Sequence, residues 1–485
     1  MRRHSFVHSL FITVVTSTHV VGCAGQLDAV RPVMPEGATE VSTAWPAYVT
    51  DDDRAMLEDA ERRIDSSRKG EVLLVVRDAR GIAVEGVQLE LSQVRHDFKF
   101  GVEEAFTPAV WGQLVRAGVN HGTVIADWTG TEPQPDNWTL EAVEASYGAH
   151  VLPDMGVDLR ASAALWMTPE RTPEHIRRLD ATALRAAVER HVRGLATRLR
   201  GNIILWDALR EPNAEWASAL GRDPNLMVSL AVAAAEAVRS VDSVTPIGVS
   251  FTHPFGEGQA ITPLAFLKRL TDAALDFDVV GLEVYYNGYK RSKSDAGKTV
   301  SELMPRRSIA ELAEILSEFD RFGKTLHISG ISVPSVPYPT DRAIAGYWGR
   351  RWSEALQADY LRAFYTMAFA HASVKAIVWK DALDSSATIE HGGLFRKPGS
   401  PKPAFFALRN LIRGWTTNDA GVTDIEGRLR LRGFAGDYQV TVRDTLTGEA
   451  TTLPARIREG ELDTLTIDLP ETWLPPEPIP VASEP

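Results

Sequence analysis

The sequence is poor in the residues from which redox, metal and nucleic-acid sites are built. It has a single cysteine, Cys23, in 485 residues, which excludes an internal disulfide and any metal site with several cysteine ligands. The 12 histidines show no metal-ligand spacing, so we expect no metal and no cofactor. The formal net charge of −12, without any basic run, argues against a nucleic-acid partner.

A long hydrophobic run is also missing. Residues 6–22 follow a basic start and are mostly apolar, but the stretch is too short and too interrupted for a stable membrane span. It leads into Val20-Val21-Gly22-Cys23, which resembles a bacterial lipobox, in which the cysteine is acylated and becomes the mature N-terminus. We therefore expect residues 1–23 to be a lipoprotein signal, and the exported chain to be held at the outer membrane or cell surface by a lipid on Cys23. The alternative is an ordinary secretion signal with a chance cysteine, which also exports the protein.

The rest of the chain divides into a tether, a large central part and two small β-rich parts. Residues 24–50 carry Pro, Gly, Thr and Ser without period and suit a flexible tether. Residues 51–97 predict a helix followed by a β-hairpin around a turn signal at residues 78–81. Short alternating stretches separated by glycines predict a small antiparallel β-module over residues 416–470, and residues 471–485 form a proline-rich tail.

Residues 98–415 repeat a pattern of strand and then helix eight times. This size and order predict a (β/α)8 barrel of the α/β class, with the small β-elements before and after it. A doubly wound open sheet is the rival, but no glycine-rich phosphate loop follows any predicted strand. We expect the chain to be a monomer. The predicted strands are residues 98–101, 118–125, 158–165, 203–209, 245–250, 279–284, 325–331 and 374–379, and the clearest helices are 182–199, 226–240, 308–322 and 355–371.

Glu211 stands at the end of the fourth predicted strand. The apolar run 203–209 is too short for a helix and indicates a buried strand, which Pro212 stops just after the carboxylate. Catalytic residues of parallel barrels lie at the carboxyl ends of the strands. A lone glutamate at this place more often caps the next helix, but Trp206 and Asp207 in the same strand favour a functional site.

The stretch Trp206-Asp207-Ala208-Leu209-Arg210-Glu211 resembles the W-D-V-V-N-E pattern of glycoside hydrolase family 10, the xylanase family. The resemblance covers nearly everything from residue 72 to 412 and includes Lys402-Pro403-Ala404 before the last helix. It implies a retaining hydrolase of β-linked polysaccharides or oligosaccharides, with Glu211 as the acid/base. Arg210 replaces the asparagine that normally contacts the 2-hydroxyl of the sugar.

The second catalytic carboxylate of the family is replaced. The family ends its seventh strand with I-T-E-L-D, whereas this chain has Ile328-Ser329-Gly330-Ile331-Ser332, which places Gly330 at the nucleophile position and closes the covalent route. Glu283 is the best substitute, because it ends a strand two away from Glu211. A separation of about 6.5–9.5 Å between the two carboxyl groups would suit an inverting mechanism. The alternative is that Glu283 only bonds Tyr285 or a neighbouring arginine.

Arg210 and four aromatic residues complete the expected site. A guanidinium beside Glu211 favours a charged carboxylate, whereas a general acid must carry a proton, so we interpret Arg210 as half of an ion pair or as a contact to an acidic sugar. Trp206 is expected to face either the cleft or the surrounding helices. The aromatic residues that could stack on sugars are Trp128, Trp166, Tyr285 and Trp379, and for any single tryptophan a place in the core is about as frequent.

Two functions from different classes follow. The first is an exported family 10-like hydrolase of a xylan-like β-glycan, with Glu211 as the acid/base and with its retaining activity in doubt because Gly330 stands at the nucleophile position. The second is a non-catalytic saccharide-binding or scaffold protein that keeps the cleft and has lost the nucleophile.

Overall fold

The computed structural model describes residues 44–213, 223–259, 261–293, 299–337, 346–385, 388–443, 448–470 and 473. The expected signal with Cys23, residues 24–43 of the expected tether, and the proline-rich tail apart from Trp473 lie outside the described residues. Within the described part of the chain, no helix combines the length and the hydropathy that crossing a bilayer requires.

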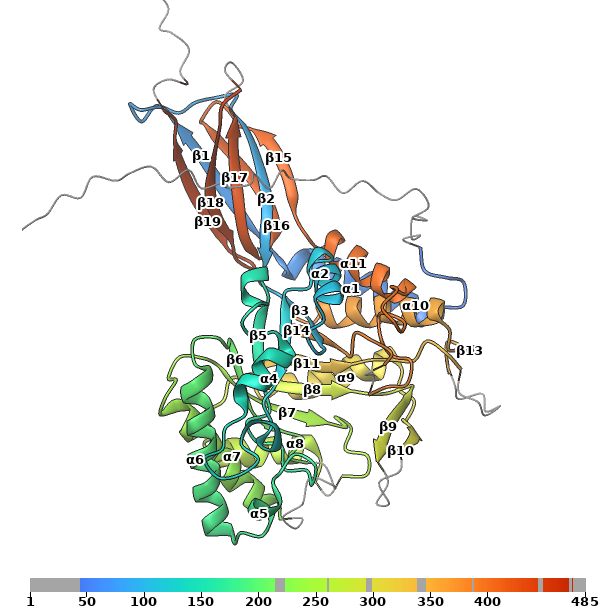
Figure 1. The fold of residues 1–485 in the computed structure, drawn as a ribbon. Helices are drawn as coiled ribbons and strands as arrows, with labels where there is room; N and C mark the ends of the chain where they lie inside the picture. Colours follow the sequence, from blue (N-terminus) through green and yellow to red (C-terminus); the bar gives the residue numbers. More distant parts are fainter. Residues whose placement is uncertain are drawn as a thin grey trace, which may run out of the picture. The chain divides into compact units, whose positions relative to one another are not determined.

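Eight parallel strands form a closed barrel (Figure 1). Its strands follow one another in chain order, and the last of them pairs with the first. The predicted (β/α)8 barrel is therefore confirmed. The strands are β3 (Lys99–Glu103), β4 (His121–Ile125), β5 (Asp158–Ser162), β6 (Leu205–Arg210), β7 (Ile247–Thr252), β8 (Val279–Val284), β11 (Thr325–Ile331) and β14 (Val374–Lys380).

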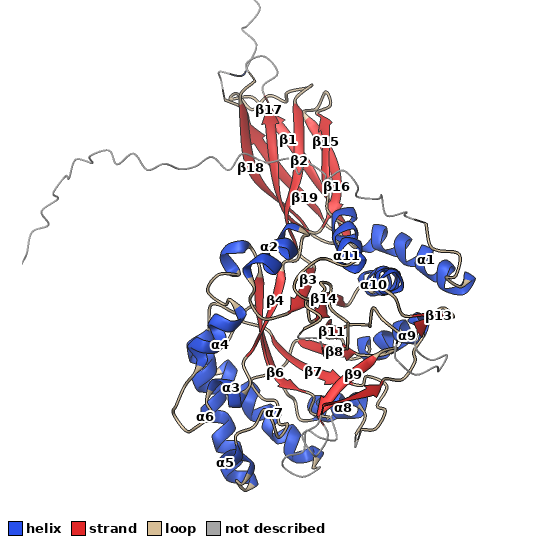
Figure 2. Ribbon diagram, turned by 45° about the vertical axis from the view of Figure 1, so that its right-hand side comes forward, coloured by secondary structure: helices blue, strands red, loops and turns tan. Residues whose placement is uncertain are grey.

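Helices surround the barrel strands (Figure 2). Local signals set where they begin: the Asp180 carboxylate accepts from Ala183 N–H at the start of α6, and Ser308 with Glu311 forms a capping box on α9. The apolar side of α9, from Ile309 to Phe319, is buried. The larger helices are α1 (Asp51–Ser67), α2 (Pro108–Arg116), α4 (Leu140–Tyr147), α6 (Ala181–Leu199), α7 (Pro224–Arg239), α8 (Pro263–Asp272), α9 (Ile309–Asp320), α10 (Glu354–Phe369) and α11 (Pro403–Gly414).

Short elements occupy the loops between barrel strands. Two small antiparallel hairpins follow β8 and β11 respectively, and short helical segments follow β4 and β5. They are α3 (Trp128–Thr131), η1 (Pro153–Met155), α5 (Glu174–Arg177), β9 (Tyr289–Lys293) with β10 (Thr299–Leu303), and β12 (Gly346–Tyr347) with β13 (Arg350–Arg351).

The β-strands before and after the barrel combine into one module of two sheets. One sheet has the order β16-β1-β19 and the other β15-β2-β17-β18, and apolar side chains such as Leu74, Leu91 and Val440 form a common core. The strands are β1 (Lys69–Arg77), β2 (Gln88–His96), β15 (Asn418–Val422), β16 (Arg428–Phe434), β17 (Gly436–Arg443), β18 (Ala450–Ile457) and β19 (Leu462–Asp468).

The predicted hairpin over residues 72–92 is wrong, because β1 and β2 lie in different sheets. The turn signal itself holds: the Asp78 carboxylate accepts from the backbone N–H groups of Arg80 and Ile82. The chain leaves this turn toward the second sheet, where β2 pairs with β15 and β17. Alternation of buried and exposed residues is the same for either pairing, so the pattern could not identify the partners.

Candidate functional site

The residues expected to carry chemistry lie at one end of the barrel. Glu211 directly follows β6, and Glu283, Gly330 and Trp379 are the last residues but one of β8, β11 and β14. All four are therefore at the carboxyl ends of parallel strands, as predicted. Gly330 and Glu283 are register partners in neighbouring strands.

The backbone at this end of the barrel is strained. The first residues after β5, β6, β7 and β14 are Ala163, Glu211, His253 and Asp381, with φ angles of 63°, 50°, 50° and 63°. Positive φ is uncommon for residues other than glycine and tends to cluster at functional sites. Nothing in the sequence marked Ala163, because alanine does not favour this conformation.

Arg210 is the centre of the polar contacts. Its Nη2 lies 2.5 Å from Glu283 Oε1, and its Nη1 lies 3.3 Å from Ser162 Oγ and 3.6 Å from Glu103 Oε2. Burial disfavours the charged form of Arg210 and lowers its pKa, but the Glu283 and Glu211 carboxylates outweigh this and hold the pKa above its ordinary value. Since β6 is adjacent neither to β3 nor to β8, these side chains must point into the barrel. The ion pair expected for Arg210 is present, with Glu283 as its partner.

Glu211 is held against Trp166. The indole Nε1–H of Trp166 donates to Glu211 Oε2 over 3.2 Å, and the Arg210 guanidinium lies 4.2 Å from the centroid of the same indole. A second guanidinium, of Arg171, lies 4.7 Å from that centroid. Trp166 keeps part of its surface exposed, whereas Glu211 is buried. Trp166 is thus an oriented aromatic surface directly beside the candidate acid.

Tyr285 takes the place that a side chain at position 330 would need. A Cβ built on Gly330 would lie 2.2 Å from Tyr285 Oη and 3.0 Å from its Cζ. Tyr285 is almost completely buried, and burial together with Glu283 holds the pKa of its phenol well above the ordinary value. A carboxylate at position 330 therefore has no room while Tyr285 keeps this position.

Three further buried charges in the barrel, Glu103, Arg160 and Lys380, were missed by the sequence analysis. Glu103 pairs with Lys380 and lies 3.8 Å from Arg160 Nη2, and Asp207 accepts hydrogen bonds from Ser250 Oγ at 2.9 Å. Burial raises the pKa of Asp207, against the effect of the nearby Arg160 and Arg210. These residues sit in mainly apolar strands, and only closure of the barrel brings opposite charges together.

Three aromatic assignments made from the sequence need correction, and the first is Tyr285, which is buried and presents no exposed ring to a sugar. Trp379 has no exposed surface, and its indole N–H donates to Gly392 O over 2.9 Å. Trp128 is also buried and stacks on His191, with ring centroids 4.3 Å apart. Neither ring has a free face for a sugar, because helices and loops cover both. Trp206 turns outward and donates to Asp242 Oδ2, which is the helix-facing alternative.

Lys402, from the Lys-Pro-Ala motif, has a structural task. Its buried ammonium group donates to Asp384 Oδ1 at 2.6 Å, Ser335 Oγ at 2.9 Å and His391 O at 3.0 Å. These contacts tie together the loops after β11 and β14. Across the described ranges, no group of three or more His, Cys, Asp or Glu side chains is arranged to hold a metal ion.

Comparison with known proteins agrees with this geometry at the level of the fold. No protein-family model matches the chain. A curated relative, anti-sigma-I factor RsgI6 of Acetivibrio thermocellus, is 22% identical over 409 residues, which are 80% of this chain and 46% of the relative. Endo-1,4-beta-xylanase 1 of Arabidopsis thaliana is 19% identical over 443 residues, 90% of this chain and 43% of the relative. The chain thus spans less than half the length of these two proteins.

Solved xylanase structures match the barrel. Native xylanase 10B from Thermotoga maritima superposes with a TM-score of 0.50 and 14% identity, covering 66% of this chain and 95% of the xylanase. A xylanase 10C variant from Cellvibrio japonicus, in complex with xylopentaose, gives 0.51 and 14%, covering 66% and 68%. The fold is that of the family 10 xylanases. The family 10 resemblance found in the Trp206–Glu211 stretch is therefore confirmed for the architecture.

Proposed function

We propose that the chain is a saccharide-binding protein built on a family 10 barrel, without the retaining hydrolysis of xylanases. The observation that carries the proposal is the contact at Gly330. Retention of configuration needs a second carboxyl group about 5–5.5 Å from the acid. Glycine supplies none, and Tyr285 Oη fills the space into which a side chain would extend.

Glu283 is a poor replacement for the missing carboxylate. It is buried, and Arg210 Nη2 holds it at 2.5 Å. An inverting mechanism needs a base that reaches a water molecule on the opposite side of the sugar. A carboxylate already engaged by a buried guanidinium would have to give up that ion pair first, which is costly in a site of low dielectric.

The surroundings of Trp166 support binding of a sugar. The partly exposed indole is fixed by Glu211 on its N–H and by Arg210 near its ring. Aromatic rings that combine an apolar face with an oriented polar edge suit the mixed surface of a sugar. The xylanase 10C variant with the same fold binds xylopentaose. We therefore infer a β-linked xylo-oligosaccharide or polysaccharide as the ligand.

The test is calorimetric titration of the full chain with xylopentaose, run beside an assay for reducing-sugar release. We expect saturable binding without turnover, and a loss of affinity of about tenfold or more in Trp166→Ala. Trp45→Ala is the matched control, since Trp45 is another partly exposed tryptophan and packs on Arg362 away from the barrel end.

Hydrolysis would reveal itself by product stereochemistry, followed by NMR with Glu211→Ala and Glu283→Ala. Retention of configuration by the wild type would contradict the proposal and the role given to Gly330. Inversion that depends on both glutamates would show an active enzyme using the Glu211–Glu283 pair. Failure of xylopentaose to bind would remove the proposal altogether.

A further inference from the structure

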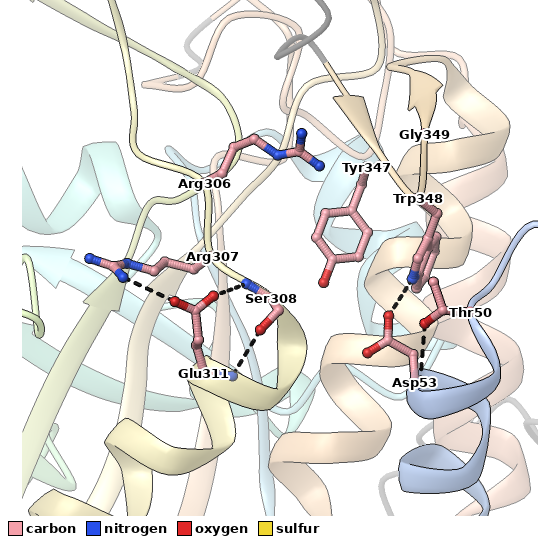
Figure 3. Close-up of a pocket in the computed structure, with 9 residues that line it drawn as sticks. All are labelled: Thr50, Asp53, Arg306, Arg307, Ser308, Glu311, Tyr347, Trp348 and Gly349. Atoms are coloured by element: carbon pink, nitrogen blue, oxygen red, sulfur yellow. Dashed lines mark hydrogen bonds and ion pairs between the residues drawn. The ribbon is translucent and has the colours of Figure 1, made fainter.

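A separate cavity lies outside the barrel, beyond the site just described. It has a volume of about 410 Å³, opens to solvent, and is lined by the amino ends of α1 and α9 and by the β12–β13 hairpin (Figure 3). Pockets for small ligands commonly have about 300–1,000 Å³. The α9 wall belongs to the connection that leaves β8, the strand of Glu283. The hairpin wall belongs to the connection that leaves β11, the strand of Gly330.

One wall of the cavity is aromatic. Trp348 is partly exposed, has a φ of 47°, and donates its indole N–H to Asp53 Oδ2 over 2.6 Å. Tyr347 lies edge-on to it, with ring centroids 4.7 Å apart. The Tyr347 hydroxyl accepts from Ile309 N–H, so its own proton is not used in that bond. A tryptophan held in a strained backbone by a carboxylate is an oriented surface rather than a loose side chain.

The charged groups around the cavity differ in their hydrogen-bond and ion-pair partners. Glu311 accepts from Ser308 N–H at 2.7 Å and pairs with Arg307 Nη1 at 3.0 Å, and Arg307 also pairs with Glu257. Arg306 is exposed and lines the same cavity. Among the described residues it has no hydrogen-bond or ion-pair partner, and Figure 3 shows its guanidinium extended toward Tyr347. An anion from a ligand would complete the set.

We propose that this cavity binds a sugar that carries one carboxylate, a uronic-acid unit. The Arg306 guanidinium pairs with the carboxylate, a geometry for which its planar donors are suited. The Trp348 ring packs on the carbon–hydrogen face of the sugar. Asp53 and Glu311 retain acceptor capacity for hydroxyl groups. The choice of a sugar rests on the proposed function, because the chemistry of the walls alone requires only a polyhydroxylated anion.

A phosphate fits the same walls less well. The first turn of α1 carries three aspartates, Asp51 to Asp53, and that of α9 carries Glu311. These carboxylates already complement the positive amino ends of the two helices, so a dianion would meet acidic neighbours on both sides. A singly charged carboxylate on a neutral ring needs only one cation, the Arg306 guanidinium.

The experiment titrates the full chain with D-glucuronate and, as the uncharged probe, D-glucose. We expect saturable glucuronate binding and at least tenfold weaker glucose binding. Arg306→Gln should weaken glucuronate binding about ten- to hundredfold, the loss of a charge-assisted pair. Arg321→Gln is the matched control, because Arg321 is 72% exposed just after the far end of α9 and should leave the affinity unchanged.

Several results would overturn the inference: equal affinity for glucose, unchanged affinity in Arg306→Gln, or inorganic phosphate binding as tightly as glucuronate. Xylan with glucuronate branches and the same xylan after debranching distinguish a polymer branch from a free acid. Trp166→Ala separates this inference from the proposed function, because it should lower xylopentaose affinity and leave glucuronate binding intact. If xylopentaose fails to bind while glucuronate binds through Arg306, the proposed function falls and the uronate site stands.

Discussion

Replacing Gly330 by alanine tests the contact on which the proposed function depends. The new Cβ would lie 2.2 Å from Tyr285 Oη, far inside van der Waals contact. Gly330 is not among the glycines with positive φ, so backbone strain does not enter. A glycine-to-alanine change at a compatible backbone normally stabilises a protein by about 0.4–1 kcal/mol. Overpacking a buried site costs about 1–3 kcal/mol, so we expect Gly330→Ala to lower the free energy of unfolding by roughly that amount.

Gly248 provides the matched control for this substitution. It lies in β7 of the same barrel, and a Cβ there would meet its nearest neighbour, Leu205 Cδ1, at 3.5 Å, an ordinary contact. Gly248→Ala should therefore be neutral or slightly stabilising. Tyr285→Phe removes the oxygen that causes the clash and leaves Tyr285 Cζ as the nearest atom, at 3.0 Å. The cost of Gly330→Ala should then fall, giving a coupling energy of about 0.5 kcal/mol or more between the two sites.

Urea unfolding of the four proteins in this double-mutant cycle, followed by tryptophan fluorescence, measures both quantities. If Gly330→Ala behaves like Gly248→Ala, or if its effect is the same with Tyr and with Phe at position 285, Tyr285 does not occupy the place of the missing side chain. The argument that a nucleophile has no room there would then fail.

Two further predictions concern other parts of the chain. Burial raises the pKa of Asp381 to about 6, against the effect of Lys380. A carboxyl group whose pKa is higher in the folded than in the unfolded protein stabilises the fold at pH values below its unfolded pKa. This stabilisation is lost as the pH rises through about 6. By pH 7 the free energy of unfolding has fallen by about 3 kcal/mol. Asp381→Asn, which tolerates the positive φ, should remove this pH-dependent loss of stability. Urea unfolding of the wild type and of Asp381→Asn between pH 4.5 and 7.5 measures it. Equal stability changes in the two proteins would contradict the raised pKa of Asp381. The lipobox-like stretch predicts a diacylglyceryl group on Cys23, and mass spectrometry of the mature N-terminus should find it; a protein cleaved elsewhere and unmodified would disprove the anchor.

The barrel could be predicted because its signals are local. Buried parallel strands are short apolar runs, and residues 279–284 and 325–331 were bounded correctly from that pattern alone. The position of Glu211 and Glu283 at strand ends follows from the same reasoning. The pairing of β1 and β2 could not be predicted, since their partners come from strands more than 300 residues later in the chain.

The side-chain arrangement inside the barrel was less accessible to prediction. Glycine at position 330 indicated that a carboxylate is missing, but only the structure shows that Tyr285 occupies the space. Arg160 faces Glu103 of the non-adjacent strand β3, and Lys380 meets the same carboxylate only because closure of the barrel makes β14 a neighbour of β3. The uronate cavity joins residues near positions 50, 306 and 348, and no motif connects segments so far apart.

The same geometry explains why position 330 and Glu283 cannot both carry a carboxylate at little cost. They are register partners in adjacent strands, and such residues point to the same side of a sheet. Two carboxylates that close would force one of them to remain protonated. Arg210 neutralises a single one, through its 2.5 Å contact with Glu283, and removing either member of that buried pair would leave an uncompensated charge. Keeping the Arg210–Glu283 pair therefore favours an uncharged residue at position 330, and glycine is such a residue.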